Sequence, residues 1–431
     1  MPRGPGRHVD DAGAVGARIR AARTRLGLSQ RDLAFDGCSY AYISRIEAGQ
    51  RTPSLQVLHE FARRLGVSAT YLATGADAPD AVDALDDADL AWRIGRDEHA
   101  EEIYRACADD RDAAPARRAR ALAGLGEVQF DRGELEQARV TLEQAMAETG
   151  LDAQRAARAS DLLGRIYALR GEQEQALAIY ERELARAEGS NDLSEVLRFS
   201  TLLANAVLDS GNTGRAQELL AQAIAVADRI DDPVGRARLW WSQSRLHDSQ
   251  GQPELAVCYA RLALGVLEDM EQSTFAAVAY LLLAHIENER EHADEAREWL
   301  ERAEPTLGGT QNRFHRGLWQ IERARAFLLG GDYEQAASLA MSALPLVGDA
   351  SAVDSGRAYA LLADVFNALG DRARARELYE LAQETLPAID RNLLRVYSGL
   401  AEILEHEGRT DEALGVLKEA MRLRQRVGGP G

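Results

Sequence analysis

The residues best suited to chemistry share one face of a short predicted helix: Tyr40, Ala41, Ser44 and Arg45. The hydrophobic core does not need this face, because isoleucines mark the opposite side of the helix. An arginine can form a bidentate pair with guanine, and an alanine can meet a thymine methyl group. The helix also has the right length to enter a DNA major groove.

This helix is the second of a predicted pair joined by a tight turn. Ser29 can cap the first helix, with Asp32 as the return partner of a capping box. Gly37 supplies the turn, Ser39 caps the second helix, and Gly49 ends it. Three further short helices are predicted around the pair, over residues 15–26, 55–66 and 68–75.

Residues 16–75 resemble a Cro/C1-type (Xre family) helix-turn-helix domain. The resemblance rests on the LGLSQ, ISRIEAG, RTPS and LGVSATYL motifs, taken together. It implies a five-helix, lambda-repressor-like domain over residues 14–75 that binds double-stranded DNA. One departure is the turn FDGCS, which is one residue shorter than the usual form and affects the entry angle of the recognition helix.

The resemblance also implies roles for single residues. Base edges are assigned to Tyr40, Ala41 and Arg45, whereas Arg51, just past a helix end, suits a phosphate. Arg23 and Glu47 match a partly buried salt bridge of similar domains and are interpreted as scaffolding. The predicted DNA-binding set is Gln30, Arg31, Ser39, Tyr40, Ala41, Ser44, Arg45, Gln50, Arg51 and Thr52.

Charge is unevenly distributed along the 431 residues. Residues 1–75 carry eleven arginines against six acidic residues, a net charge of +5. Because the whole chain carries −18, the remainder carries −23. A basic head on an acidic body indicates that nucleic acid contacts only the head.

The sequence contains no pattern typical of catalysis or of a cofactor site. It has no phosphate-binding glycine loop, no HExxH motif and no nucleophile elbow. The three cysteines lie far apart, with neither metal-ligand spacing nor a disulfide framework. No apolar run approaches the length of a membrane span. The prediction is a non-enzymatic cytoplasmic protein without metal, cofactor or membrane partner.

The rest of the chain repeats with a spacing of 38–40 residues. Glycine recurs at eight positions, and Glu291 falls at the midpoint of one double gap. Five residues after each of these nine positions stands an alanine, and seven residues before it a small residue. A glycine can turn the chain between antiparallel helices, and small residues let those helices approach closely. The turn glycines are Gly95, Gly133, Gly171, Gly211, Gly251, Gly331, Gly370 and Gly408.

This pattern resembles tetratricopeptide repeats in a long variant. It predicts an all-α chain in which about nine helix pairs, over residues 81–427, stack into a right-handed solenoid. Residues 76–80 are predicted to be an acidic linker, and residues 1–13 and 428–431 disordered ends.

A column of basic and amide residues is predicted on the concave wall of this solenoid. Positions thirteen and six residues before each turn are two helical turns apart, so they share one face. One interpretation is a groove for a peptide or other anionic ligand, in which arginines hold carboxylates and Asn205 an extended backbone. The candidate groove residues are Arg158, Arg165, Arg198, Asn205, Arg238, Trp241, Arg245, His285, Asn288 and Arg325.

Two other interpretations of this column remain open. The arginines could form ladders of ion pairs with Asp and Glu between adjacent repeats, although a ligand groove is favoured for repeats three to six. Alternatively, the groove could hold a helix of another protomer.

The leading hypothesis is a sequence-specific transcriptional regulator whose repeat domain senses a peptide or other small ligand and controls a homodimer. The architecture resembles peptide-responsive regulators of Gram-positive bacteria, in which groove occupancy changes the curvature of the solenoid. The alternative is a DNA-bound scaffold whose repeats recruit a protein partner without a small ligand.

Overall fold

The computed structural model describes most of the chain. The described ranges are 12–35, 38–67, 69–75, 84–93, 96–269, 273–308, 312–348, 351–387 and 392–427. Within them the regular secondary structure is helical, apart from one isolated bridge between Phe35 and Cys38. The all-α fold predicted from the sequence is therefore confirmed.

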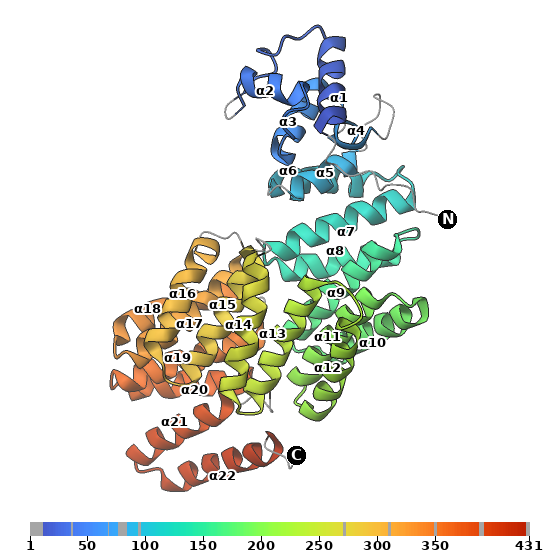
Figure 1. The fold of residues 1–431 in the computed structure, drawn as a ribbon. Helices are drawn as coiled ribbons and strands as arrows, with labels where there is room; N and C mark the ends of the chain where they lie inside the picture. The colour runs from blue at the N-terminus through green and yellow to red at the C-terminus, as the bar shows by residue number, and fades with distance from the viewer. Residues whose placement is uncertain are drawn as a thin grey trace. The chain divides into compact units, whose positions relative to one another are not determined.

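Four short helices form the head (Figure 1). They are α1 (Ala12–Arg25), α2 (Tyr40–Glu47), α3 (Leu55–Leu65) and α4 (Ala69–Thr74). Their apolar faces meet in one core that includes Ile19, Leu33, Ile43, Ile46 and Phe61, all without solvent exposure. Arg18 joins α1 to α4 by donating to the carbonyl oxygens of Leu72 and Ala73 at 2.8 and 2.6 Å.

The helix predicted after Ser29 is shortened to a single turn over residues 30–33. The capping box itself is formed, since Ser29 N–H donates to Asp32 at 2.8 Å and Asp32 N–H donates to Ser29 Oγ at 3.2 Å. The chain is already extended at Phe35, so the helix cannot continue. A single turn lacks the further hydrogen bonds that offset the entropic cost of starting a helix. The five predicted helices are thus four helices and a capped turn, and Gly37 lies outside the described residues.

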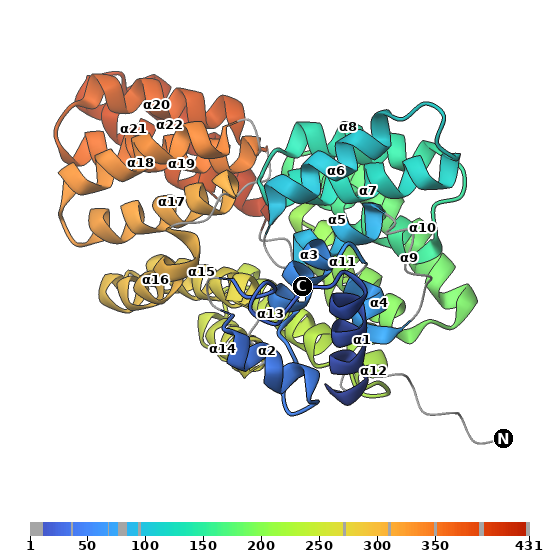
Figure 2. The same cartoon turned by 90° about the horizontal axis from the view of Figure 1, so that it is seen from above.

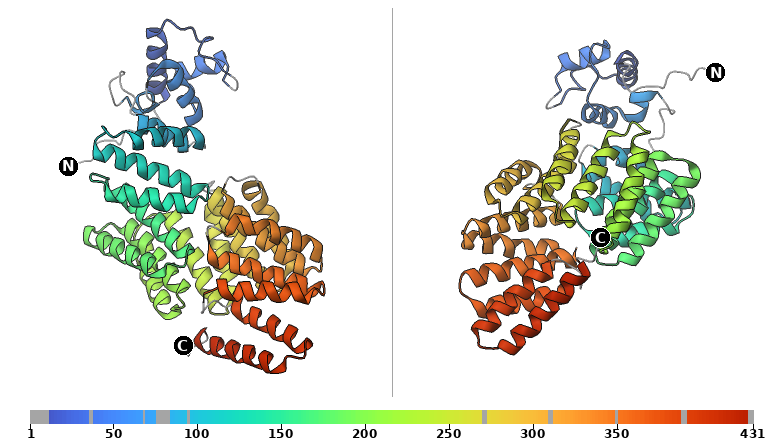
Figure 3. Two further views of the ribbon diagram at one scale, coloured as in Figure 1. Left: turned by 180° about the vertical axis from the view of Figure 1, so that it is seen from behind. Right: turned by 60° about the horizontal axis from the view of Figure 1, so that its bottom comes forward.

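Eighteen further helices run as antiparallel pairs through the body (Figures 1 and 3). They are α5 (Ala84–Arg93), α6 (Asp97–Asp109), α7 (Pro115–Asp131), α8 (Leu135–Ala147), α9 (Ala153–Leu169), α10 (Gln173–Ser190), α11 (Leu193–Asp209), α12 (Thr213–Ala227), α13 (Pro233–Ser249), α14 (Pro253–Asp269), α15 (Ser273–Glu289), α16 (Ala293–Leu307), α17 (Arg313–Leu329), α18 (Tyr333–Val347), α19 (Ala352–Ala368), α20 (Arg372–Thr385), α21 (Asn392–His406) and α22 (Thr410–Val427). Figure 2 shows α19 to α22 lying side by side at the end of the series.

The turns between paired helices have the predicted chemistry. Gly133, Gly171 and the later turn glycines adopt φ values between 70° and 84°. Glu291, which replaces glycine in the double gap, also adopts a positive φ of 62°. The nine alanines five residues after the turns are at most 1 % exposed. Their small side chains therefore let the two helices of each pair pack closely. Gly95 lies outside the described residues.

The described residues form two compact units, one from residues 1–128 with 141–155 and one from 129–140 with 156–431. The head shares the first unit with α5 and α6, and His59 of α3 hydrogen-bonds Asp87 of α5 at 2.7 Å. The predicted linker, residues 76–80, and the tail, residues 428–431, lie outside the described residues. Of the predicted disordered N-terminus, Ala12 and Gly13 are already helical.

A contact inside the second unit joins segments that are far apart in the sequence. Asn312, which caps α17, donates to the carbonyl oxygen of Asp131 at 2.8 Å. Next to it, Arg313 N–H donates to the carbonyl oxygen of Arg132 at 3.3 Å. The end of α7 and the start of α17 are thereby held together.

Candidate functional site

The predicted base-reading face of α2 points away from the head core. Tyr40 is 52 % exposed, and Ala41 and Arg45 are also exposed, whereas Ile43 and Ile46 on the other side are fully buried. The separation follows from the helical spacing of the two isoleucines, which leaves the remaining positions free of the core. The face is therefore available to a ligand that approaches α2 from outside.

The residues around α2 extend this exposed surface. The guanidinium of Arg31 lies 5.3 Å from the centre of the Tyr40 ring, so the capped turn and α2 contribute to one surface. Ser39 Oγ accepts from Tyr42 N–H at 3.3 Å and caps the helix. Past the left-handed Gly49 the loop is exposed, and it carries the predicted phosphate-binding residues Gln50, Arg51 and Thr52.

The salt bridge predicted between Arg23 and Glu47 is present. Two nitrogens of Arg23 donate to the two carboxylate oxygens of Glu47 at 2.6 and 2.8 Å, and a third donates to Leu28 O. Burial works to raise the pKa of Glu47, but hydrogen bonds from Arg23 and Gln30 outweigh it and lower the pKa. The pair fixes α1 against the end of α2, as its interpretation as scaffolding requires.

Gln30 has a contact that its predicted phosphate role does not include. Its side-chain amide donates to Glu47 at 2.8 Å, and the residue is half-buried. Gln30 therefore supports the Arg23–Glu47 pair, while its exposed neighbour Arg31 keeps a free approach to solvent.

In the body, the predicted groove residues lie on alternate helices, as the repeat pattern requires. Arg158 and Arg165 are on α9, and Arg198 is on α11. Arg238 on α13 has a lowered pKa, because burial disfavours its charge and the charges of Arg158, Arg165 and Arg198 add to this, while Asp161 opposes it. These four arginines are defined here as the arginine cluster.

Three members of the arginine cluster are short of partners. Among the described residues, Arg165 and Arg238 make no ion pair and instead lie over Phe130 and Phe275, at 5.2 and 5.1 Å from the ring centres. Arg198 Nη2 forms an ion pair with Glu195 Oε2 at 3.1 Å, whereas the buried Nε of Arg198 has no hydrogen-bond partner among the described residues. Arg165 and Arg238 thus lack a carboxylate partner among the described residues, and Arg198 keeps one buried donor without an acceptor.

Trp241, one helical turn after Arg238, has the same deficit. Its buried indole Nε1 has no hydrogen-bond acceptor among the described residues. A buried unpaired donor is costly, so an acceptor supplied from outside is favoured at this position.

Asn205 and Arg245 are engaged inside the wall. The Asn205 amide donates to Ser242 Oγ at 2.9 Å and accepts from Arg245 at 3.4 Å, while Arg245 also pairs with Asp209 at 2.5 Å. The Asn205 side chain thus contacts the adjacent repeat, and its predicted hold on a ligand backbone stays a prediction.

The groove residues on α15 and α17 form an ion-pair ladder. His285 and Asn288 bind the Glu322 carboxylate at 2.9 and 2.8 Å, and Arg325 pairs with Glu289. Burial raises the pKa of Glu322, but its charged and hydrogen-bonded neighbours hold it at about 2. Adjacent helices supply carboxylates to these three candidates, which favours the ion-pair ladder for them, and their place in a ligand groove stays a prediction.

The sequence did not predict that aromatic rings lie against the arginine cluster. Phe130 is the last residue but one of α7, whereas Phe275 lies in the first turn of α15, so the two rings occupy different positions of the repeat. No periodic signal links them, and only the folded arrangement brings them beneath Arg165 and Arg238.

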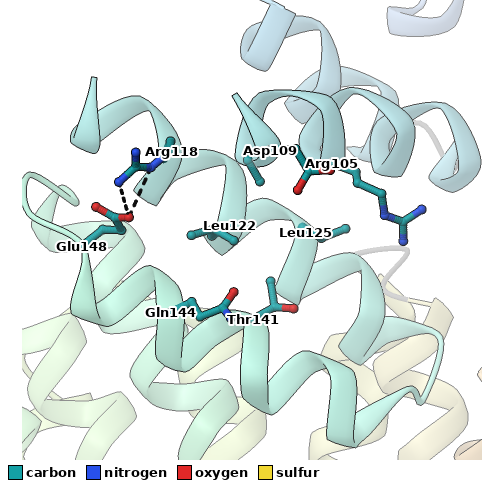
Figure 4. Close-up of a pocket in the computed structure, with 9 residues that line it drawn as sticks. Arg105, Asp109, Arg118, Leu122, Leu125, Thr141, Gln144 and Glu148 are labelled. Carbon is teal, nitrogen blue, oxygen red and sulfur yellow. Dashed lines mark hydrogen bonds and ion pairs between the residues drawn. The ribbon is translucent and has the colours of Figure 1, made fainter. Parts of the chain in front are cut away.

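A cavity of about 520 Å³ lies in the first unit, between α6, α7 and the end of α8 (Figure 4). Leu122 and Leu125 form its apolar wall. Its arginines are engaged, since Arg118 pairs with Glu148 at 2.6 Å and Arg105 pairs with Glu101. No predicted site residue lines it.

Within the described ranges, no helix is long and apolar enough to cross a bilayer. The same residues contain no group of three or more His, Cys, Asp or Glu side chains that could hold a metal ion.

Comparison with known proteins supports a helix-turn-helix head followed by a body of tetratricopeptide repeats. A helix-turn-helix family matches residues 19–72, a tetratricopeptide repeat family matches 119–144, and the MalT-like TPR region matches 150–428, more than half of the chain. A relative from Sinorhizobium fredii, the uncharacterized HTH-type transcriptional regulator y4dJ, is 39 % identical over 64 residues, which are 15 % of this chain and 83 % of the relative. The chain belongs to the HTH-type transcriptional regulators and carries a MalT-like TPR region. Both families are of non-enzymatic kinds.

Solved structures resemble the fold of this DNA-binding regulator. A Rap protein complexed with Competence and Sporulation Factor aligns with a TM-score of 0.58 at 13 % identity, over 90 % of this chain and 99 % of Rap. NprR in complex with its cognate peptide NprX aligns with a TM-score of 0.49 at 15 % identity, over 64 % of this chain and 82 % of NprR. The Rap alignment supports the TPR-like solenoid.

Proposed function

We propose that this regulator binds its operator as a homodimer and that an anionic ligand in the solenoid groove controls the dimer. The observation that carries the proposal is the positive charge gathered in the arginine cluster beside Trp241, whose buried indole nitrogen has no hydrogen-bond acceptor among the described residues.

The DNA half of the proposal assigns base reading to Tyr40, Ala41 and Arg45 and phosphate binding to Arg31 and Arg51. All five side chains are exposed, and they lie on α2 or directly beside it. Two heads would read two half-sites about 34–36 Å apart, one turn of the duplex.

Replacement of Arg45 tests this reading face. Arg45→Ala should lose about 1–3 kcal/mol of specific binding and relax the preference for one base pair, as expected for a bidentate contact with guanine. The operator is first identified by genome-wide footprinting, and affinities are then measured by fluorescence anisotropy. Arg63→Ala is the matched control, because Arg63 is an exposed head arginine paired with Glu60. Normal operator binding by Arg45→Ala would refute the assignment.

The ligand half rests on charge. The charges of Arg158, Arg165 and Arg198 on α9 and α11 disfavour the charge of Arg238 on α13, although Asp161 and Glu195 offset part of this positive charge. A carboxylate or phosphate would accept hydrogen bonds from the unpaired donors of Arg198 and Trp241 and would reduce the repulsion among the arginines. A ligand that contacts α9, α11 and α13 together binds best when these helices lie close to one another. Its binding would therefore draw the helices together and change the spacing of the two heads.

A single variant separates a ligand site from a structural one. Arg238→Met should raise the melting temperature of the free protein, because it removes a buried like charge, and should abolish stabilisation by ligand. The probes are synthetic acidic peptides with a free C-terminus, the same peptides amidated, and inorganic phosphate. They distinguish a terminal carboxylate, a side-chain carboxylate and a phosphate as the bound group.

Arg325→Met is the control for this experiment. It breaks the pair with Glu289 and should lower the melting temperature without changing the response to the probes. If every probe raises the melting temperatures of wild type and of Arg238→Met equally, the groove proposal fails, whereas the DNA-binding assignment stands.

A further inference from the structure

The position nine residues after each turn is buried in eight of the nine helix pairs. Its side chain there is at most 2 % exposed. The residues concerned are Tyr104, Leu142, Tyr180, Leu220, Ala260, Leu300, Ala340 and Tyr379. The ninth, Leu417 on α22, is 37 % exposed.

This position is where the next helix pair packs. Tyr180 lies 6.4 Å from Phe199 of α11, measured between ring centres. Tyr379 fills the space beside Gly399 of α21, where a Cβ atom would overlap its ring. Leu417 occupies the same register on α22. The side of α22 that carries Leu417 therefore corresponds to the surface on which another helix packs in the earlier pairs.

The exposed face of α22 carries apolar side chains over two turns, from Leu414 to Met421. Leu414 is 52 % exposed and Met421 65 %, and both lie on the same side as Leu417. Ala413 and Leu423, on the adjoining side of the helix, are buried against the rest of the solenoid. We define Leu414, Leu417 and Met421 as the α22 face.

The charges along α22 indicate what covers this face. Asp411 and Glu412 lie in its first turn, whereas Lys418, Arg422 and Arg424 lie in its second half beside one acidic residue, Glu419, which pairs with Arg422. Asp411 and Arg424 are exposed and form no ion pair with any residue that the structure describes. An antiparallel copy of α22 would place its acidic turn level with the basic half of the first, whereas a parallel copy would align like charges.

We propose that the α22 face is the dimer interface of this regulator, covered by α22 of a second copy in antiparallel orientation. Such a contact is isologous, since the same patch meets itself about a two-fold axis. With Leu414 opposite the Met421 of the other copy, the axis passes beside Leu417, which then meets its own counterpart. The inference rests on the proposed homodimer and is independent of the groove ligand.

The first experiment measures the mass of the full chain by light scattering at micromolar concentrations. Wild type should be a dimer and Leu417→Arg a monomer, because a charge would be buried at the axis. Leu381→Arg is the matched control, since Leu381 of α20 is 43 % exposed and lies outside the α22 face; it should remain dimeric. Circular dichroism checks that each variant keeps its helix content.

The second experiment tests the antiparallel register by disulfide crosslinking. The parent is Cys258→Ser, because Cys258 is the exposed cysteine among the three. Leu417→Cys should crosslink two copies under mild oxidation. Leu414→Cys should not, because its two copies would be about 10 Å apart along the helix axis, beyond the reach of a disulfide.

The outcomes separate this inference from the proposed function. A wild-type dimer with an equally dimeric Leu417→Arg places the interface elsewhere and overturns the inference alone. A monomeric wild type overturns both this inference and the proposed homodimer. Crosslinking of Leu414→Cys but not of Leu417→Cys overturns the antiparallel arrangement.

Discussion

The Arg23–Glu47 pair is the contact on which the recognition helix depends. Its side chains are 11 % and 4 % exposed, and it is bidentate. Glu47→Gln leaves the Arg23 charge without a counter-charge and should destabilise the head by about 3–5 kcal/mol. Hydrogen exchange of peptides from residues 12–75 in the full chain measures the loss. Glu412→Gln, which removes an exposed partner of Arg409, should leave exchange in the head unchanged.

The same carboxylate makes the head sensitive to acid. Because hydrogen bonds from Arg23 and Gln30 outweigh burial and lower the folded pKa of Glu47, its contribution is complete above an unfolded pKa of about 4.3. That contribution is lost as the pH falls through the lowered value. Wild type should therefore lose more head stability between about pH 5 and pH 3 than Glu47→Gln does. Exchange rates corrected for intrinsic pH dependence test this, and parallel losses in both proteins would contradict it.

At the scale of elements, α1 and α2 approach each other through a glycine. A Cβ atom on Gly16 would overlap the carbonyl oxygen of Ile46. Gly16→Ala should push α1 off α2 and cost about 1–3 kcal/mol, with loss of operator binding. Gly265→Ala is the control, since its Cβ would meet nothing within 4 Å inside α14. That change should stabilise the body by roughly 0.5–1 kcal/mol.

The turn at Glu291 is the one described helix-pair turn that lacks glycine. Its φ of 62° is strained for a residue with a Cβ atom. Glu291→Gly should therefore raise the stability of the body by roughly 0.5–1 kcal/mol, even though glycine is the more flexible residue when unfolded. Urea unfolding followed by tryptophan fluorescence measures the change. The reverse change at another turn, Gly251→Ala, should destabilise, because its φ is 70°.

At the scale of the whole molecule, charge divides the chain into a basic head and an acidic body. Salt dependence of operator binding should therefore come from the head alone. Arg51→Ala should weaken binding to all sequences alike and reduce the slope of log K against log salt by about 1. Arg422→Ala, an exposed arginine of the body, should leave the slope unchanged. Equal effects of the two variants would show that the body also contacts DNA.

Much of the fold could be predicted because its signals are local. The turn glycines, the small residue seven positions before them and the alanine five positions after them act within one helix pair. Ile43 and Ile46 likewise fixed which side of α2 is exposed. The turn at residues 30–33 was predicted as a helix, because a capping box signals a helix start but says nothing about its length.

By itself, the sequence determined a helix-turn-helix head, a body of nine helix pairs and the line of arginines along that body. Only the tertiary structure decided which of those arginines are satisfied. Arg325 finds Glu289 on a neighbouring helix, whereas Arg238 finds an aromatic ring and other arginines. The physical reason is that an ion pair depends on distances between side chains of adjacent repeats, and a repeat pattern does not encode those distances.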